Sequence, residues 1–125
     1  ADLHLQRRGS VQYHFFYSDP ITLGNSCYLF GKDERVSDIL CENPSISRQH
    51  AVIQFRMMPK MNIDGSYTEF IKPYIMIYID EWDLLNDEKI EPSRYYELLH
   101  KDVLKFGFSD REYVLVKQEV DPNTI

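Results

Sequence analysis

Two short groups of residues in the first half of the chain could bind an anion. Gly31-Lys32 closes one apolar run, and Ser47-Arg48-Gln49-His50 precedes another, Ala51–Phe55. A hydroxyl, an ammonium, a guanidinium and backbone N–H groups on loops are the donors that capture a phosphorylated side chain, which carries about −1.5 to −2 charges. We therefore expect Lys32, Ser47 and Arg48 to lie close together on loops that join strands.

The segments around these groups predict short β-strands. Strand-forming residues gather in nine runs separated by turn residues: Val11–Tyr17, Ile21–Leu23, Cys27–Phe30, Asp38–Leu40, Ala51–Met57, Tyr67–Ile71, Tyr74–Ile79, Asp102–Phe106 and Tyr113–Val116. Asp64-Gly65 predicts a hairpin turn, and Tyr95–Leu99 is compatible with a helical turn or a strand. This pattern, without a long amphipathic helix, predicts an all-β sandwich.

The predicted core takes residues from most of these runs: Val11, Tyr13, Phe15, Leu29, Phe30, Ile39, Val52, Ile53, Phe55, Ile75, Ile77, Leu98, Val103, Leu104, Phe106 and Val114. A chain of 125 residues fits one domain. We place a short extension at about 1–10 and a tail at about 118–125. The start without Met suggests a domain taken from a longer protein.

Composition argues against several classes of function. The net charge is −6 and the pI is about 5.1, which disfavours specific nucleic-acid binding. No apolar run approaches the length of a membrane span. Cys27 and Cys41 are too few for a zinc site, and we expect both to be buried free thiols. The four histidines have no metal-binding spacing, and no nucleophile elbow is present. We expect no cofactor, no metal and no enzyme activity.

The spacing of Gly31-Lys32 and Ser47-x-x-His50 resembles the signature of forkhead-associated (FHA) domains, which are β-sandwiches that bind phosphothreonine peptides. The resemblance runs from about Val11 to Lys117. Over this length the chain is similar to nuclear FHA proteins of RNA processing. It rests on Tyr28–Lys32, Ser47–Arg56, Lys72–Tyr74, Lys89–Leu98 and Lys101–Ser109.

This resemblance implies a nuclear adaptor that supports pre-mRNA splicing and retention of unspliced pre-mRNA, with the cytoplasm left open as a second location. Its partners would be a phosphothreonine-containing protein and other subunits of a splicing-associated complex. Those subunits would bind through segments outside this chain.

The resemblance also assigns roles in the first loop. Lys32 stands where the family has an arginine that grips the peptide and its phosphate. Ser47 stands at the phosphate-binding serine, and Arg48 follows at a further polar contact. Ser45 belongs to the same expected phosphopeptide-binding group, at a position that is often basic in the family. Gly31 and His50 are expected to be structural, with His50 bracing the loops.

A second loop departs from the family pattern. Glu81-Trp82-Asp83 stands where Asn-Gly-Thr is usual, and two carboxylates there should repel a phosphate. An alignment shift of one or two residues would give the asparagine's role to Asn86. Trp82 is either an exposed contact or a lid over the end of the sandwich. The alternative function is therefore a phosphate-independent scaffold that uses the sheet edges or the Trp82 loop.

Overall fold

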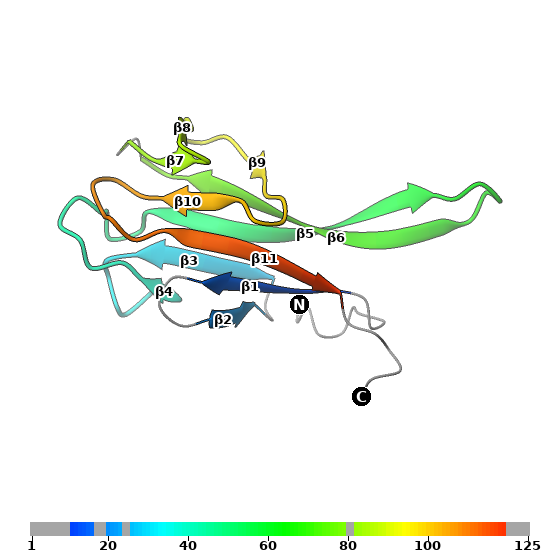
Figure 1. Ribbon diagram of the computed structural model, residues 1–125, viewed down its shortest axis with the longest axis horizontal. Helices are drawn as coiled ribbons and strands as arrows, with labels where there is room; N and C mark the ends of the chain where they lie inside the picture. Colours follow the sequence, from blue (N-terminus) through cyan, green and yellow to red (C-terminus); the bar gives the residue numbers. More distant parts are fainter. Residues whose placement is uncertain (1–10, 17–19, 24–25, 80–81, 120–125) are drawn as a thin grey trace.

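The computed structural model describes residues 11–16, 20–23, 26–79 and 82–119, and all its regular elements are strands (Figure 1). They are β1 (Val11–Phe16), β2 (Pro20–Leu23), β3 (Cys27–Gly31), β4 (Ile39–Leu40), β5 (Ala51–Met61), β6 (Tyr67–Ile77), β7 (Leu84–Leu85), β8 (Glu88–Lys89), β9 (Tyr96–Glu97), β10 (Val103–Lys105) and β11 (Tyr113–Glu119). Two sheets form, in the orders β2-β1-β11-β10-β7-β8 and β4-β3-β5-β6-β9. The predicted all-β sandwich is confirmed.

The longest elements form one hairpin, β5–β6. Its eleven residue pairs run from Ala51↔Ile77 to Met61↔Tyr67. The predicted turn at Asp64-Gly65 is confirmed: the Asn62 N–H donates to the Ser66 carbonyl over 2.7 Å, and Gly65 has a φ of 89°, which favours glycine. The distal half of the hairpin projects beyond the sandwich (Figure 1).

The sequence predicted two runs, Tyr67–Ile71 and Tyr74–Ile79, where the structure has the single strand β6. Hydrogen-bonded and non-hydrogen-bonded pairs alternate along an antiparallel ladder. Because Asn62 and Ser66 are hydrogen-bonded, Pro73 lies in a non-hydrogen-bonded pair with Phe55. The missing N–H of Pro73 therefore leaves the β5–β6 ladder intact. Tyr78 and Ile79 follow the strand as exposed bend residues.

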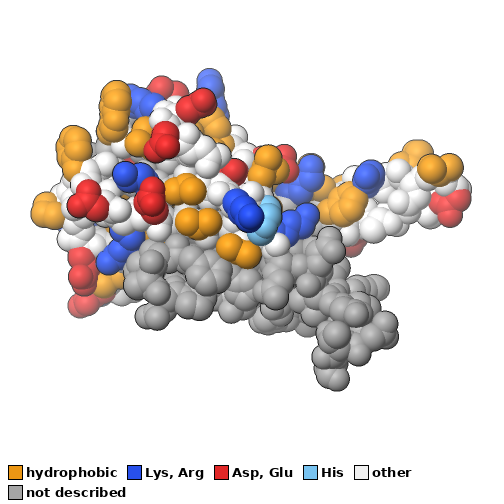
Figure 2. Space-filling model, viewed as in Figure 1, with side chains coloured by type: hydrophobic (Ala, Val, Ile, Leu, Met, Phe, Trp, Pro, Cys, Tyr) orange, Lys and Arg blue, Asp and Glu red, His pale blue; other side chains and the backbone are white. Residues whose placement is uncertain are grey.

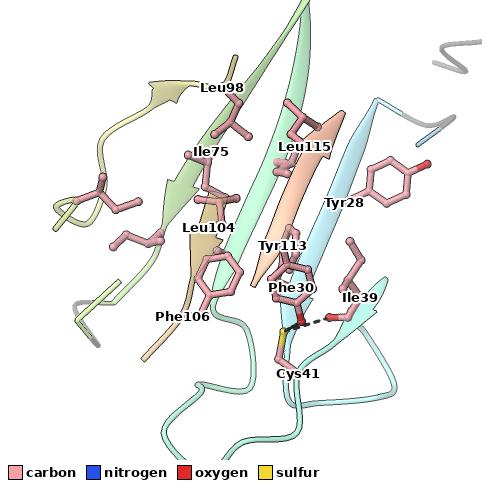
Figure 3. Close-up of a cluster of buried hydrophobic side chains, with 14 of the residues drawn as sticks. Tyr28, Phe30, Ile39, Cys41, Ile75, Leu98, Leu104, Phe106, Tyr113 and Leu115 are labelled. Carbon is pink, nitrogen blue, oxygen red and sulfur yellow. Dashed lines mark hydrogen bonds between the residues drawn. The ribbon is translucent and has the colours of Figure 1, made fainter. Parts of the chain in front are cut away.

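The core lies between the sheets (Figure 3). Phe30, Phe106 and Tyr113 form an aromatic cluster with ring centroids 5.1 to 5.7 Å apart. The Cys41 sulfur lies 3.2 Å from the Tyr113 hydroxyl. Burial raises the pKa of the Cys41 thiol and, more strongly, that of the Tyr113 phenol. These groups therefore stay neutral and can be buried without an ion partner.

Three predicted core residues prove to be half-buried: Leu29, Val103 and Val114. Their strand neighbours Tyr28, Tyr113 and Leu115 are buried instead. Successive side chains along a strand point to opposite faces of the sheet. An error of one position therefore assigns a surface residue to the core and a core residue to the surface. Val11, Tyr13 and Phe15 lie in β1, whose side chains are outside the described part of the structure.

Three further expectations are corrected or resolved. Cys27 is exposed and Cys41 is buried, and both thiols are free. The segment Tyr95–Leu99 contains a strand, β9 (Tyr96–Glu97). Strand β11 continues to Glu119 and pairs there with Val11, so it extends into the segment predicted as a tail.

Candidate functional site

The end of β3 approaches the loop before β5 very closely. The Lys32 N–H donates to the Ser47 carbonyl over 3.0 Å, and the Asp33 N–H donates to the Arg48 carbonyl over 3.2 Å. A Cβ on Gly31 would lie 2.0 Å from the Arg48 carbonyl oxygen. No side chain fits there, so the glycine permits the approach. Lys32 and Arg48 are exposed and Ser47 is half-buried, and the structure thus brings these three predicted residues together.

His50 is fully buried and joins this loop to a second one. Its Nδ1 accepts the Ser47 N–H over 3.1 Å, and its Nε2 lies 2.7 Å from Asp83 Oδ1. Because Nδ1 accepts, the ring proton lies on Nε2 and is donated to the carboxylate. Asp83 Oδ1 also accepts the Gly107 N–H over 3.1 Å. We call Ser47, His50, Asp83 and Gly107 the hub, because they connect three loops.

Ser45 makes a second connection beside the hub. Its hydroxyl donates to the Asn43 side chain over 2.7 Å and accepts the Phe108 N–H over 2.8 Å. Gly107 has a φ of 56°, and a Cβ there would lie 2.6 Å from the Ser45 oxygen. Ser45 was predicted to lie at the peptide-binding position, but its hydroxyl here joins two loops of the protein.

Asp83 does not act as the exposed, repelling carboxylate that the sequence suggested. Its side chain is fully buried, and Oδ1 is held by His50 and Gly107. Oδ2 has no hydrogen-bond partner among the described residues. The hydrogen bonds from the His50 ring and the Gly107 N–H stabilise the carboxylate in its buried position. Glu81, the other acid of the predicted pair, lies outside the described residues.

Trp82 and Asn86 occupy different environments. Trp82 is 55% exposed with a φ of 63°, and the Lys89 ammonium lies 4.6 Å from its ring centroid. Asn86 has a φ of 52° in the β7–β8 turn, donates to Asp102 and accepts the Val103 N–H, both over 2.9 Å. Both ends of its amide hold the β7–β8 turn against the start of β10.

Two exposed cations, Lys32 and Arg48, lie at the first loop. Arg35 forms an ion pair with Asp33 at 3.1 Å. Its hydrogen bond, with a smaller contribution from the Arg48 charge, lowers the pKa of Asp33. The acid beside Lys32 is therefore already paired, and Lys32 and Arg48 remain cations at the surface. This arrangement suits an anionic ligand.

Behind these loops lies a cavity of about 260 Å³. It is lined by Cys41, Glu42, Asn43, Ile46, Phe106, Ser109, Arg111 and Tyr113. Among the described residues no cluster could hold a metal ion, and no helix could cross a membrane. The contacts of Asp83 with His50 and Gly107 were not predicted. The separation of 33 residues between His50 and Asp83 gives no local pattern that could reveal their contact.

Comparisons with known proteins agree with this geometry. A family model of the FHA domain matches residues 28–107. The chain is 48% identical over 103 residues to the FHA domain-containing protein DDL of Arabidopsis thaliana, covering 81% of this chain and 33% of that protein. It is 46% identical over 101 residues to Smad nuclear-interacting protein 1 of Mus musculus, covering 80% of this chain and 26% of that protein.

Among solved structures, the yeast Pml1 splicing factor of the RES complex superposes with a TM-score of 0.71 at 28% identity. That match covers 94% of this chain and 87% of the other. The chain spans a third or less of the length of the two sequence relatives.

Proposed function

This chain belongs to the FHA domain family, and on that premise we propose that it binds a phosphothreonine-containing protein and supports pre-mRNA splicing and nuclear retention of unspliced pre-mRNA. FHA domains are interaction modules, so the proposal assigns the chain no catalysis. The role in splicing and retention is supported by two similar proteins, Smad nuclear-interacting protein 1 and the yeast Pml1 splicing factor. Residues 11–119 form the FHA domain in this proposal, and its location is the nucleus.

The observation that carries the proposal is the assembly of Lys32, Ser47 and Arg48 around the Gly31 contact. The Ser47 hydroxyl and the Arg48 guanidinium would donate to the phosphate, and the Lys32 ammonium would add a second charge. Lysine lacks the planar fork of arginine, so Lys32 acts as a point charge. His50 shapes the loop from inside and stays out of contact with the ligand.

Three residues at the margins of the site take lesser roles. Ser45 holds the loop by bonding the Phe108 N–H. Trp82, exposed beside Lys89, offers a ring to residues that flank the phosphothreonine. Asn86 belongs to the β7–β8 turn and takes no part.

The binding experiment is a titration with a degenerate phosphothreonine peptide library and its unphosphorylated copy. We expect a Kd of about 1 μM for the best phosphopeptides, close to −8 kcal/mol. Ser47→Ala and Arg48→Ala should each weaken binding by about 1.5–3 kcal/mol, because each removes a hydrogen bond to a charged group. Arg94→Ala removes another exposed arginine and serves as the control. No gain on phosphorylation would refute the proposal.

The cellular part is tested in the full protein with the Ser47→Ala, Arg48→Ala double variant. We expect unspliced transcripts to leak into the cytoplasm when this variant replaces the normal protein, whereas Arg94→Ala should retain them. Normal retention with the double variant would favour the alternative, a phosphate-independent scaffold. The exposed surface of the β5–β6 hairpin supports keeping that alternative.

A further inference from the structure

The distal half of the β5–β6 hairpin, residues 56–72, leaves the sandwich without a neighbour on either side among the described residues; we call it the arm (Figure 1). Strand β3 pairs with β5 only as far as Gln54, and β9 pairs with β6 at Tyr74 and Ile75. An isolated two-stranded ribbon is marginally stable in water. A third strand would therefore stabilise the arm.

One face of the arm is largely apolar, and Glu69, opposite Pro59, is the one acid on it. Met57, Met61 and Tyr67 are 52%, 60% and 64% exposed. By the alternation of side chains along a strand, they continue the sheet face that Ile53 and Phe55 bury in the core. Methionine-rich surfaces adapt to partners of different shape. Hydrophobic side chains along the projecting hairpin are visible in Figure 2. This face is a sheet surface that the second sheet does not cover.

The opposite face of the arm concentrates positive charge in a chain of net charge −6. Arg56 and Lys72 face each other directly across the ladder, and like charges at such positions are destabilising. Lys60 lies on the same face, four residues along β5. Glu97, at 3.7 Å from Lys72, is the one acid paired with these cations in the described part of the chain. An acidic partner would relieve this repulsion.

The two edges of the arm differ in their capacity to accept another strand. Residues in non-hydrogen-bonded pairs direct their backbone N–H and C=O groups away from the partner strand. On the β5 edge this applies to Pro59. On the β6 edge it applies to Tyr67 and Glu69. Pro59 has no N–H, so it interrupts any ladder on its side. Tyr67 and Glu69 each present a donor and an acceptor. The β6 edge is therefore the one suited to pairing.

We propose that the β6 edge of the arm binds an extended segment of a partner protein by strand addition, with alternating apolar and acidic residues. Its apolar side chains would lie beside Tyr67 on the uncovered face, and its acidic side chains would lie near Lys72 and Lys60. A strand edge offers backbone pairing that a polypeptide can use and an RNA strand cannot, which favours a protein partner. This interaction requires no phosphate and is separate from the loop site.

The probe is an acetylated, amidated peptide of alternating valine and glutamate, titrated into the 125-residue chain and followed by NMR. We expect shifts at the backbone amides of Tyr67 and Glu69 and none at Lys32 or Ser47. The matching valine–lysine peptide should bind about tenfold more weakly, since its charges meet cations of the same sign. Equal binding of the two peptides would overturn the proposal.

Two variants at one position separate the backbone from the side chain. Glu69→Pro removes the outward N–H and should weaken binding about tenfold, the effect of one lost hydrogen bond. Glu69→Gln keeps the N–H and should bind within about threefold of the parent, because only an exposed charge is lost. If Glu69→Pro binds as the parent does, strand addition is wrong.

Two further measurements keep the test independent of how the proline variant folds. Methylating the pairing nitrogens of the valine–glutamate peptide should abolish binding to the unaltered chain, and retained binding would contradict the pairing. An oligouridine RNA should not compete with the peptide. If the RNA displaces it and shifts the same amides, the arm is a nucleic-acid surface and the proposed partner class is wrong.

Discussion

His50→Ala should damage stability far more than a typical surface change. The imidazole accepts the Ser47 N–H, donates to Asp83 and packs edge-on against Phe106 at 5.3 Å between centroids. Its loss leaves the half-buried Ser47 N–H unsatisfied, removes one of two donors from a buried carboxylate and opens a void. Losing a hydrogen bond to a charged group costs about 1.5–3 kcal/mol and leaving the backbone N–H unsatisfied costs about 1–3 kcal/mol, so we expect a total loss of about 3–5 kcal/mol.

The assay is thermal unfolding followed by circular dichroism. With an unfolding entropy of about 2.1 cal/mol/K per residue, a 125-residue chain should lose about 10–20 °C in Tm. His100→Ala is the matched control, because His100 is exposed and accepts one backbone N–H, that of Lys117. That control should lower the Tm by no more than about 4 °C, which corresponds to one exposed hydrogen bond.

A phosphopeptide titration completes the test at a temperature where both variants are folded. His50→Ala should bind more weakly only to the extent that its loop has moved. If the variant melts within about 2 °C of the parent while binding is abolished, His50 is a ligand contact and the bracing role is wrong.

Three further predictions concern the loop, the thiols and the ligand. Gly31→Ala should lower both the Tm and the phosphopeptide affinity, measured in the same melts and titrations, because its Cβ would overlap the Arg48 carbonyl oxygen; an unchanged variant would contradict this. Iodoacetamide labelling, followed by mass spectrometry, should modify exposed Cys27 before buried Cys41. Both rates should rise with pH, because the thiolate is the reactive form and both thiol pKa values are raised. Faster labelling of Cys41 would refute the assigned burial. Matched phosphothreonine peptides should bind more tightly than phosphoserine peptides, because one buried methyl group contributes about 0.8 kcal/mol; equal affinities would count against a recess for that methyl.

The sequence predicted most strands of the fold because its signals are local, but it did not predict the two-residue strands β7 and β8. Alternating runs gave the strands, and Asp64-Gly65 gave the hairpin turn, which the structure confirms. The errors at Leu29 and Val114 have one cause. In a run that is apolar throughout, the hydrophobic pattern does not show which face of the strand is buried. That face is determined by how the strand pairs with its neighbours in the sheet.

The candidate site was predictable in its first loop and not in its second. Ser47 and His50 lie three residues apart, so their relation appears in the sequence. Asp83 was interpreted from its charge alone, as an exposed acid. Its burial depends on the His50 Nε2–H and the Gly107 N–H, which only the assembled sheets bring near. The length of the arm was also not predicted, because the sequence divides β6 into two runs, Tyr67–Ile71 and Tyr74–Ile79, that the structure joins in one ladder.

The hub also bears on how the chain folds. Its members come from three loops, so their bonds close only after strands far apart in sequence have met, and such contacts form late. Interactions absent from the folding transition state affect the rate of unfolding and leave the rate of folding nearly unchanged. Substitutions at His50 or Asp83 should therefore shorten the lifetime of the folded protein without slowing its formation. The residues that shape the loops would then set how long the domain, once formed, stays able to hold a partner.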